Sequence, residues 1–148
     1  MVRLFILLII IIHCDKILSQ DNLEINADQF TYDKDNTRIF ATGNVEIIDN
    51  KFKLYADKVF LNNSSKVLSA QENIKIFNSD GTILTANKIV ADQSLNNAIM
   101  NDNYIYYPSE DLKFGKNYLR LAAKKVERRN TDWEKMDYGI FTACKICF

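Results

Sequence analysis

Histidine, glycine and proline are scarce in this chain of 148 residues. The only histidine, His13, lies in an apolar amino-terminal segment, so the rest of the chain lacks the commonest general base and metal ligand. The four glycines are isolated from one another, which excludes a glycine-rich phosphate loop. Lysine plus arginine and aspartate plus glutamate number 19 each, so no net field attracts nucleic acid. We therefore expect no enzyme, no cofactor and no metal site.

The first residues have the pattern of a targeting segment. Arg3 precedes an unbroken apolar run from Leu4 to Ile12, which is too short to cross a hydrocarbon core that needs about 20 residues. Small Ser19 offers a cleavage position. We interpret residues 1–19 as a secretory signal peptide and residues 20–148 as one domain; a permanent amino-terminal anchor is the alternative.

Apolar and polar residues alternate one by one along short runs, and this pattern returns about every 30 residues. Arg38 to Val59 holds two such runs on either side of a polar turn at Asp49-Asn50, which is typical of a β-hairpin with one buried face. Two landmarks return at one step: Ala27, Ala56 and Ala86 lie 29 (56−27) and 30 (86−56) residues apart, and Asn44, Asn73 and Asn103 lie 29 (73−44) and 30 (103−73) apart. The repeat predicts an all-β chain of antiparallel hairpins.

The fourth unit is displaced, and we expect a surface loop near Pro108, which should end its strand because proline cannot donate to a ladder. Asp111 to Arg129 is the best helical window, but Gly115 interrupts it, so we predict another hairpin there.

An alanine is followed three residues later by a large apolar residue in every unit. Residues three apart in an uninterrupted strand point to opposite faces, so either both faces are partly buried or a bulge resets the alternation. Four occurrences favour a recurrent corner, as in a sheet that folds over on itself. The pairs are Ala27/Phe30, Ala56/Val59, Ala86/Ile89 and Ala123/Val126.

Strand parity predicts one shared apolar face. Its candidate members are Ile39, Val45, Ile47, Leu54, Leu68, Ile74, Ile76 and Leu84.

Cys144-Lys145-Ile146-Cys147 is the one sharp chemical motif. A redox-active dithiol normally begins a helix, and no helix follows. A zinc site needs two more ligands, which the chain after residue 19 lacks. A structural disulfide in an oxidising compartment fits best, and partners outside this sequence stay open.

Ala56-Asp57-Lys58-Val59, the segment Ala41 to Val45 and the 30-residue repeat together resemble the OstA-like domain of the lipopolysaccharide transport proteins LptA, LptC and LptD. Tyr138 to Cys147 resembles the segment that ends the periplasmic domain of LptD before its barrel. The likeness covers Leu23 to Cys147, and the cysteine pair favours the LptD amino-terminal domain.

The resemblance implies a β-jellyroll with an open apolar groove that carries the acyl chains of lipopolysaccharide, with the eight apolar residues above as its lining. It implies docking through edge strands to an LptA-like bridge protein, and Ile25 and Phe30 lie on the candidate edge. It also implies a periplasmic location at the outer membrane and disulfides from Cys144 and Cys147 to the barrel segment of LptD, which acts with a lipoprotein partner. The barrel is absent here, which indicates a truncated form, a split gene product or a partial reading frame.

Two other classes compete with a lipid-transport module. A structural β-solenoid or adhesin predicts a closed core without lipid binding, and a thiol oxidoreductase predicts Cys144 at the start of a helix with a reactive thiolate.

Overall fold

The computed structural model describes residues 23–109, 117–130 and 133–142, and they form strands and turns. The predicted signal peptide, most of the region predicted as a loop near Pro108, and the cysteine pair lie outside these ranges. The strands are β1 (Glu24–Asn26), β2 (Gln29–Tyr32), β3 (Arg38–Ile48), β4 (Phe52–Asn62), β5 (Val67–Asn78), β6 (Ile83–Asp92), β7 (Ala98–Ser109), β8 (Asn117–Arg129) and β9 (Trp133–Thr142).

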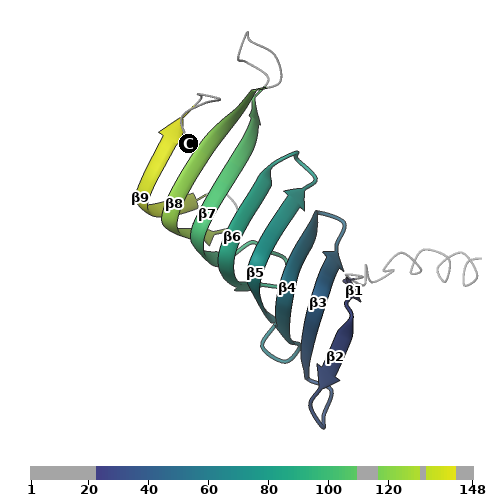
Figure 1. Cartoon of the computed structure of the whole chain (residues 1–148). Coiled ribbons are helices and arrows are strands. Elements are labelled where there is room, and N and C mark those ends of the chain that lie inside the picture. The colour runs from purple at the N-terminus through teal and green to yellow at the C-terminus, as the bar shows by residue number, and fades with distance from the viewer. Residues whose placement is uncertain (1–22, 110–116, 131–132, 143–148) are drawn as a thin grey trace, which may run out of the picture.

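All nine strands belong to one antiparallel sheet, and from β3 to β9 each strand pairs with the next strand in the chain (Figure 1). The order is β1-β3-β4-β5-β6-β7-β8-β9, and β2 also pairs with β3. The first and last strands do not pair with each other, so the sheet is open. The predicted all-β architecture of repeated hairpins is confirmed. The described part of the window from Asp111 to Arg129 is not a hairpin by itself but the single strand β8, which pairs with β7 and β9.

The long strands are interrupted at mid-length by the predicted corner. The ladder register shifts between Thr42 and Val45 in β3, between Tyr55 and Lys58 in β4, and between Gln71 and Ile74 in β5. On either side of the shift in β4, Ala56 and Val59 are both buried. The bulge hypothesis is therefore correct, because the inserted residue returns the same face to the interior.

Left-handed backbone builds these corners. Gly43 and Asn44 have φ of 77° and 46°, and the equivalent Glu72 and Asn73 have φ of 65° and 53°. Asparagine tolerates this conformation better than most residues. A side chain at position 43 would be blocked as well, because a Cβ there would lie 2.5 Å from an Asp28 carboxylate oxygen.

One hydrogen bond repeats at successive corners. Asn44 Nδ2 donates to Asp28 Oδ2 at 2.9 Å, and Asn73 Nδ2 donates to Asp57 Oδ2 at 2.7 Å. Both bonds join residues 16 apart in the chain. The Ala-Asp and Asn landmarks of the sequence repeat are thus the two sides of one corner.

The corners divide the sheet into two halves. Arm A consists of residues 29–32, 38–42, 58–62, 67–71, 88–92, 98–101, 125–129 and 133–137. Arm B consists of residues 24–26, 45–48, 52–56, 74–78, 83–86, 103–109, 117–123 and 139–142.

The two arms face each other. Inward side chains of both arms join one hydrophobic cluster whose members are at most 8% exposed. The described residues form no second layer, so burial this complete requires the sheet to fold over on itself. The result is a β-jellyroll, as predicted.

Pro108 departs from the sequence expectation, because β7 continues through it to Ser109 and pairs Pro108 with Tyr118. The ladder between β6 and β7 ends at the pair Ile83 and Tyr106. Beyond that point β7 has a partner on one side only, so a residue without an N–H costs no bond on the other side.

Candidate functional site

The candidate site is the apolar interior between the arms. Seven of the eight predicted residues belong to the buried cluster at 0–6% exposure, and the eighth, Ile39, is partly buried against it. The seven are Val45, Ile47, Leu54, Leu68, Ile74, Ile76 and Leu84.

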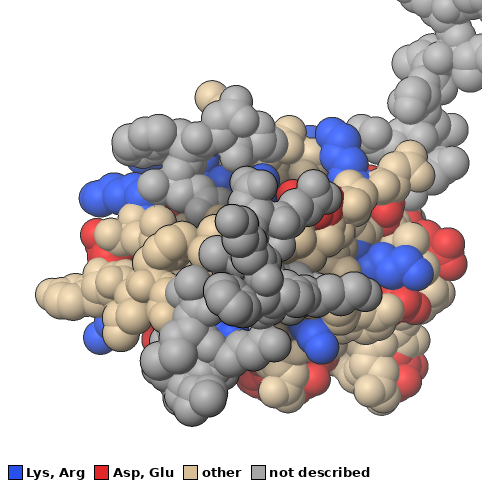
Figure 2. Space-filling view, turned by 90° about the horizontal axis from the view of Figure 1, so that it is seen from above, with Lys and Arg blue, Asp and Glu red and all other residues tan. Residues whose placement is uncertain are grey.

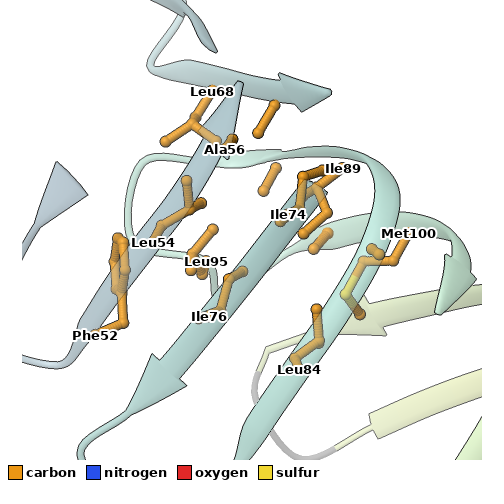
Figure 3. Close-up of a cluster of buried hydrophobic side chains, with 14 of the residues drawn as sticks. Phe52, Leu54, Ala56, Leu68, Ile74, Ile76, Leu84, Ile89, Leu95 and Met100 are labelled. Atoms are coloured by element: carbon orange, nitrogen blue, oxygen red, sulfur yellow. The ribbon is translucent and has the colours of Figure 1, made fainter. Parts of the chain in front are cut away.

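These residues form rows that run across the strands. In arm B, Ile47 pairs with Leu54, Leu54 with Ile76, and Ile76 with Leu84. Figure 3 shows Leu54, Ile76 and Leu84 directed into one space from β4, β5 and β6. The ladder continues the row through Ile105 of β7 to Leu121 of β8, so the apolar strip crosses almost the whole sheet.

Sequence parity found only part of the interior. Most of the missed residues follow the corner in their strand, where the alternation restarts. Counting the alternation afresh after Ala56, Ala86 and Ala123 would have found Val59, Leu61, Ile89 and Val126, but not Ile105 or Leu121. The missed residues include Val59, Leu61, Ile89, Ile105, Leu121 and Val126, all at 0–3% exposure.

The interior is filled by its own side chains. Leu54 and Leu68 are 0% exposed and Ile74 is 2% exposed, and Leu95 from the turn between β6 and β7 adds to the cluster. A ligand that enters between the arms must therefore replace the contacts that the inward side chains of the two arms make with each other. Each buried methylene contributes about 0.8 kcal/mol, so an apolar guest can replace what the parting arms lose.

Asn103 is a polar side chain within this apolar interior and is 1% exposed. Its Nδ2 donates to the Met100 carbonyl at 3.3 Å, whereas its Oδ1 is buried without a hydrogen-bond partner. The sequence landmarks align Tyr104 of β7 with Val45 and Ile74, but Tyr104 is 47% exposed and Asn103 points inward instead. The alignment of the third unit was therefore wrong by one residue.

Both edges of the sheet carry exposed apolar side chains. At the β1/β2 edge, the predicted docking residue Ile25 pairs with Ile47 and is half-buried, and Phe30 is exposed on β2. At the opposite edge, Tyr138, Ile140 and Phe141 of β9 are all exposed. An edge strand offers main-chain groups for pairing with another chain, so either edge can take a further strand.

Charges are confined to the outer surface and the turns. Seen from above, acidic and basic side chains are interspersed (Figure 2). Lys58 Nζ donates to Glu72 at 2.8 Å, which raises the pKa of Lys58 above its usual value. Tyr55 Oη donates to Glu46 at 2.9 Å, which raises the pKa of Tyr55. Such exposed pairs contribute little stability, and neither lies in the interior.

Within the described residues, no three histidine, cysteine, aspartate or glutamate side chains lie close enough together to hold a metal ion. The same part of the chain contains no helix with the length and apolarity needed to cross a membrane.

The fold defines the class of protein. It is a β-jellyroll made of one open sheet, and the inward side chains of the two arms form a single apolar interior. A sequence model of the family described as "LptA/(LptD N-terminal domain) LPS transport protein" matches residues 24–130. The match covers more than half of the chain, and the chain belongs to this family of lipopolysaccharide transport proteins. The predicted resemblance is confirmed, and the family is one of periplasmic transport modules and not of enzymes.

A solved structure shares the fold. It is that of LptH, described as "the LptA homologous periplasmic component of the conserved lipopolysaccharide transport device from Pseudomonas aeruginosa". The TM-score is 0.59 at 12% sequence identity, over 78% of this chain and 82% of that one. At this identity the likeness shows the fold alone. Among curated proteins, none matches the chain.

Proposed function

We propose that this protein receives lipopolysaccharide by taking its acyl chains between the two arms of the sheet. The observation that carries the proposal is the continuous apolar interior of an open sheet, from Ile47 in β3 to Leu121 in β8. Membership of a lipopolysaccharide transport family supports the choice of ligand.

The energetics allow such exchange. A twelve-carbon acyl chain that leaves water gains about 10 kcal/mol, at about 0.8 kcal/mol per methylene, before the costs of ordering and of parting the arms. Because the arms already bury each other's side chains, the net gain is smaller than this figure. A carrier that must also release its cargo benefits from that offset.

The proposed assembly uses the sheet edges. An LptA-like bridge protein adds its edge strand to β1 and β2, so that main-chain hydrogen bonds join two sheets and their interiors continue. The site of action is the periplasm beside the outer membrane. There the partners are the barrel segment of LptD, to which Cys144 and Cys147 bond, and its lipoprotein.

Site-specific photo-crosslinking tests the lipid proposal. A photoreactive residue at Val45 or Ile74, which are 1% and 2% exposed, should capture lipopolysaccharide. The next residue in each strand, Glu46 or Lys75, points to the outer surface and provides a matched control that should remain unlabelled. Equal labelling at all four sites, or none at any, contradicts the proposal, and the latter result favours a purely structural β protein.

A proline scan tests the docking edge. Ile25→Pro or Phe30→Pro should abolish binding to an LptA-like protein and leave the strands from β3 onward folded. Lys34→Pro is the control, because Lys34 is an exposed residue of the turn from Asp33 to Asn36, where proline is tolerated. Undiminished binding by both edge variants would locate the contact elsewhere.

A further inference from the structure

Asn103 occupies a position that other repeats fill with aliphatic residues. The corners of β3 and β5 each use two left-handed residues, after which Val45 and Ile74 turn inward. The corner of β7 uses one, Asp102 with φ of 49°. The inward position therefore falls on Asn103, one residue earlier than the repeat spacing predicts.

The surroundings of Asn103 are apolar and small. It pairs with Ala123 of β8, and the register on the β6 side, where Thr85 pairs with Tyr104, places Ala86 next to it. Ile105, which follows it on the inward face, is 1% exposed. Alanines on both sides leave room beside the carboxamide once the arms part.

The fold provides a hydrogen-bond partner for the nitrogen of the Asn103 side chain but not for its oxygen. The bond from Nδ2 to the Met100 carbonyl closes the corner around Asp102, which is a structural role. The Oδ1 atom lies buried without a donor, and a buried polar atom left unpaired is costly. The bond to Met100 fixes the orientation of the amide, because turning it by 180° would bring Oδ1 against the Met100 carbonyl oxygen, and both are acceptors.

We propose that Asn103 recognises a hydroxyl group on an acyl chain held between the arms. A hydroxyl group can donate its hydrogen to the unpaired Oδ1. It also brings no charge, whereas a carboxylate or phosphate at this depth would require a cation that the row beside Asn103 lacks. The ligand class is a hydroxylated fatty acyl chain, and the inference rests on the proposed lipid-binding function.

The expected selectivity is the gain from one hydrogen bond to an otherwise unpaired buried group, which is about tenfold in affinity. Isothermal titration calorimetry with the uncharged methyl esters of tetradecanoic acid and 3-hydroxytetradecanoic acid measures it directly. The wild-type protein should prefer the hydroxylated ester about tenfold. Asn103→Leu should lose the preference and bind the plain ester at least as tightly as the wild type does.

Asn101→Leu is the matched control, because it makes the same change two residues earlier on the outward face of β7 and should keep the preference. A wild-type protein that binds both esters equally overturns the inference even if Asn103→Leu does not fold. A preference that survives in Asn103→Leu overturns it too. Failure of the wild type to bind either ester contradicts the proposed lipid-binding function instead.

Discussion

Replacing Asn73 separates the two contributions that the corner motif makes to stability. Asn73 has φ of 53°, and its Nδ2 donates to Asp57 at 2.7 Å on an exposed part of the surface. Left-handed backbone costs an ordinary residue about 1 to 2 kcal/mol, and an exposed hydrogen bond contributes about 0.5 to 1 kcal/mol. Asn73→Ala should therefore lower the free energy of unfolding by about 1.5 to 3 kcal/mol.

Two further variants isolate each contribution. Asn73→Gly keeps the backbone conformation and loses only the hydrogen bond, so its cost should be about 0.5 to 1 kcal/mol. Asp57→Ala removes the same bond from the other side and should cost a similar amount. The double variant Asp57→Ala/Asn73→Gly should cost less than the sum of the two, because both changes delete one interaction.

Urea denaturation followed by circular dichroism at neutral pH gives the four free energies, with a shared slope as the check on two-state behaviour. The reasoning fails if Asn73→Gly is as destabilising as Asn73→Ala, since the left-handed backbone would then contribute nothing. It also fails if the two single variants without backbone strain are fully additive, because the hydrogen bond would then not be the shared element.

Three other predictions use the same denaturation assay. Leu54→Ala, at a fully buried position, should cost about 3 kcal/mol, whereas Lys53→Ala on the outward face should change the stability by less than about 0.5 kcal/mol; equal effects would contradict the placement of the interior. The hydrogen bond from the Arg38 backbone N–H lowers the pKa of Asp33 below its usual 3.8, so its stabilisation is present above about pH 4 and is lost as the pH falls through the lowered value. Asp33→Asn should reduce the decrease in the free energy of unfolding at low pH. An unchanged decrease would show that Asp33 does not contribute to it. The double variant Cys144→Ser/Cys147→Ser should melt within a few degrees of the parent, and a loss of several kcal/mol would show that the pair is a local staple.

The hairpins were predictable because their signals are local. Alternation of apolar residues, polar turns such as Asp33 to Asn36, and the return of Ala-Asp and Asn at one step all depend on near neighbours in the chain. The corner was also predictable, because the offset of three between Ala56 and Val59 has no other simple explanation in a strand.

Two features of β7 were not predictable from those signals. Whether a corner uses one left-handed residue or two depends on how its strand fits its neighbours, and the sequence step of 30 residues does not distinguish Asn103 from Tyr104 as the inward residue. The tolerance of Pro108 depends on where β6 ends, which is a property of the neighbouring strand. Both outcomes are tertiary, so local patterns do not contain them.

The ladder between consecutive strands makes the length of this protein adjustable. Each repeat of about 30 residues contributes two strands, and neighbouring strands lie about 4.8 Å apart, so one more repeat would lengthen the space between the arms by about 10 Å. Its cross-section would not change, because the width is set by the strand halves on either side of each corner. Gene duplication can thus extend such a conduit in uniform increments, and every added unit needs only its own Asp–Asn corner and one existing neighbour to fold against.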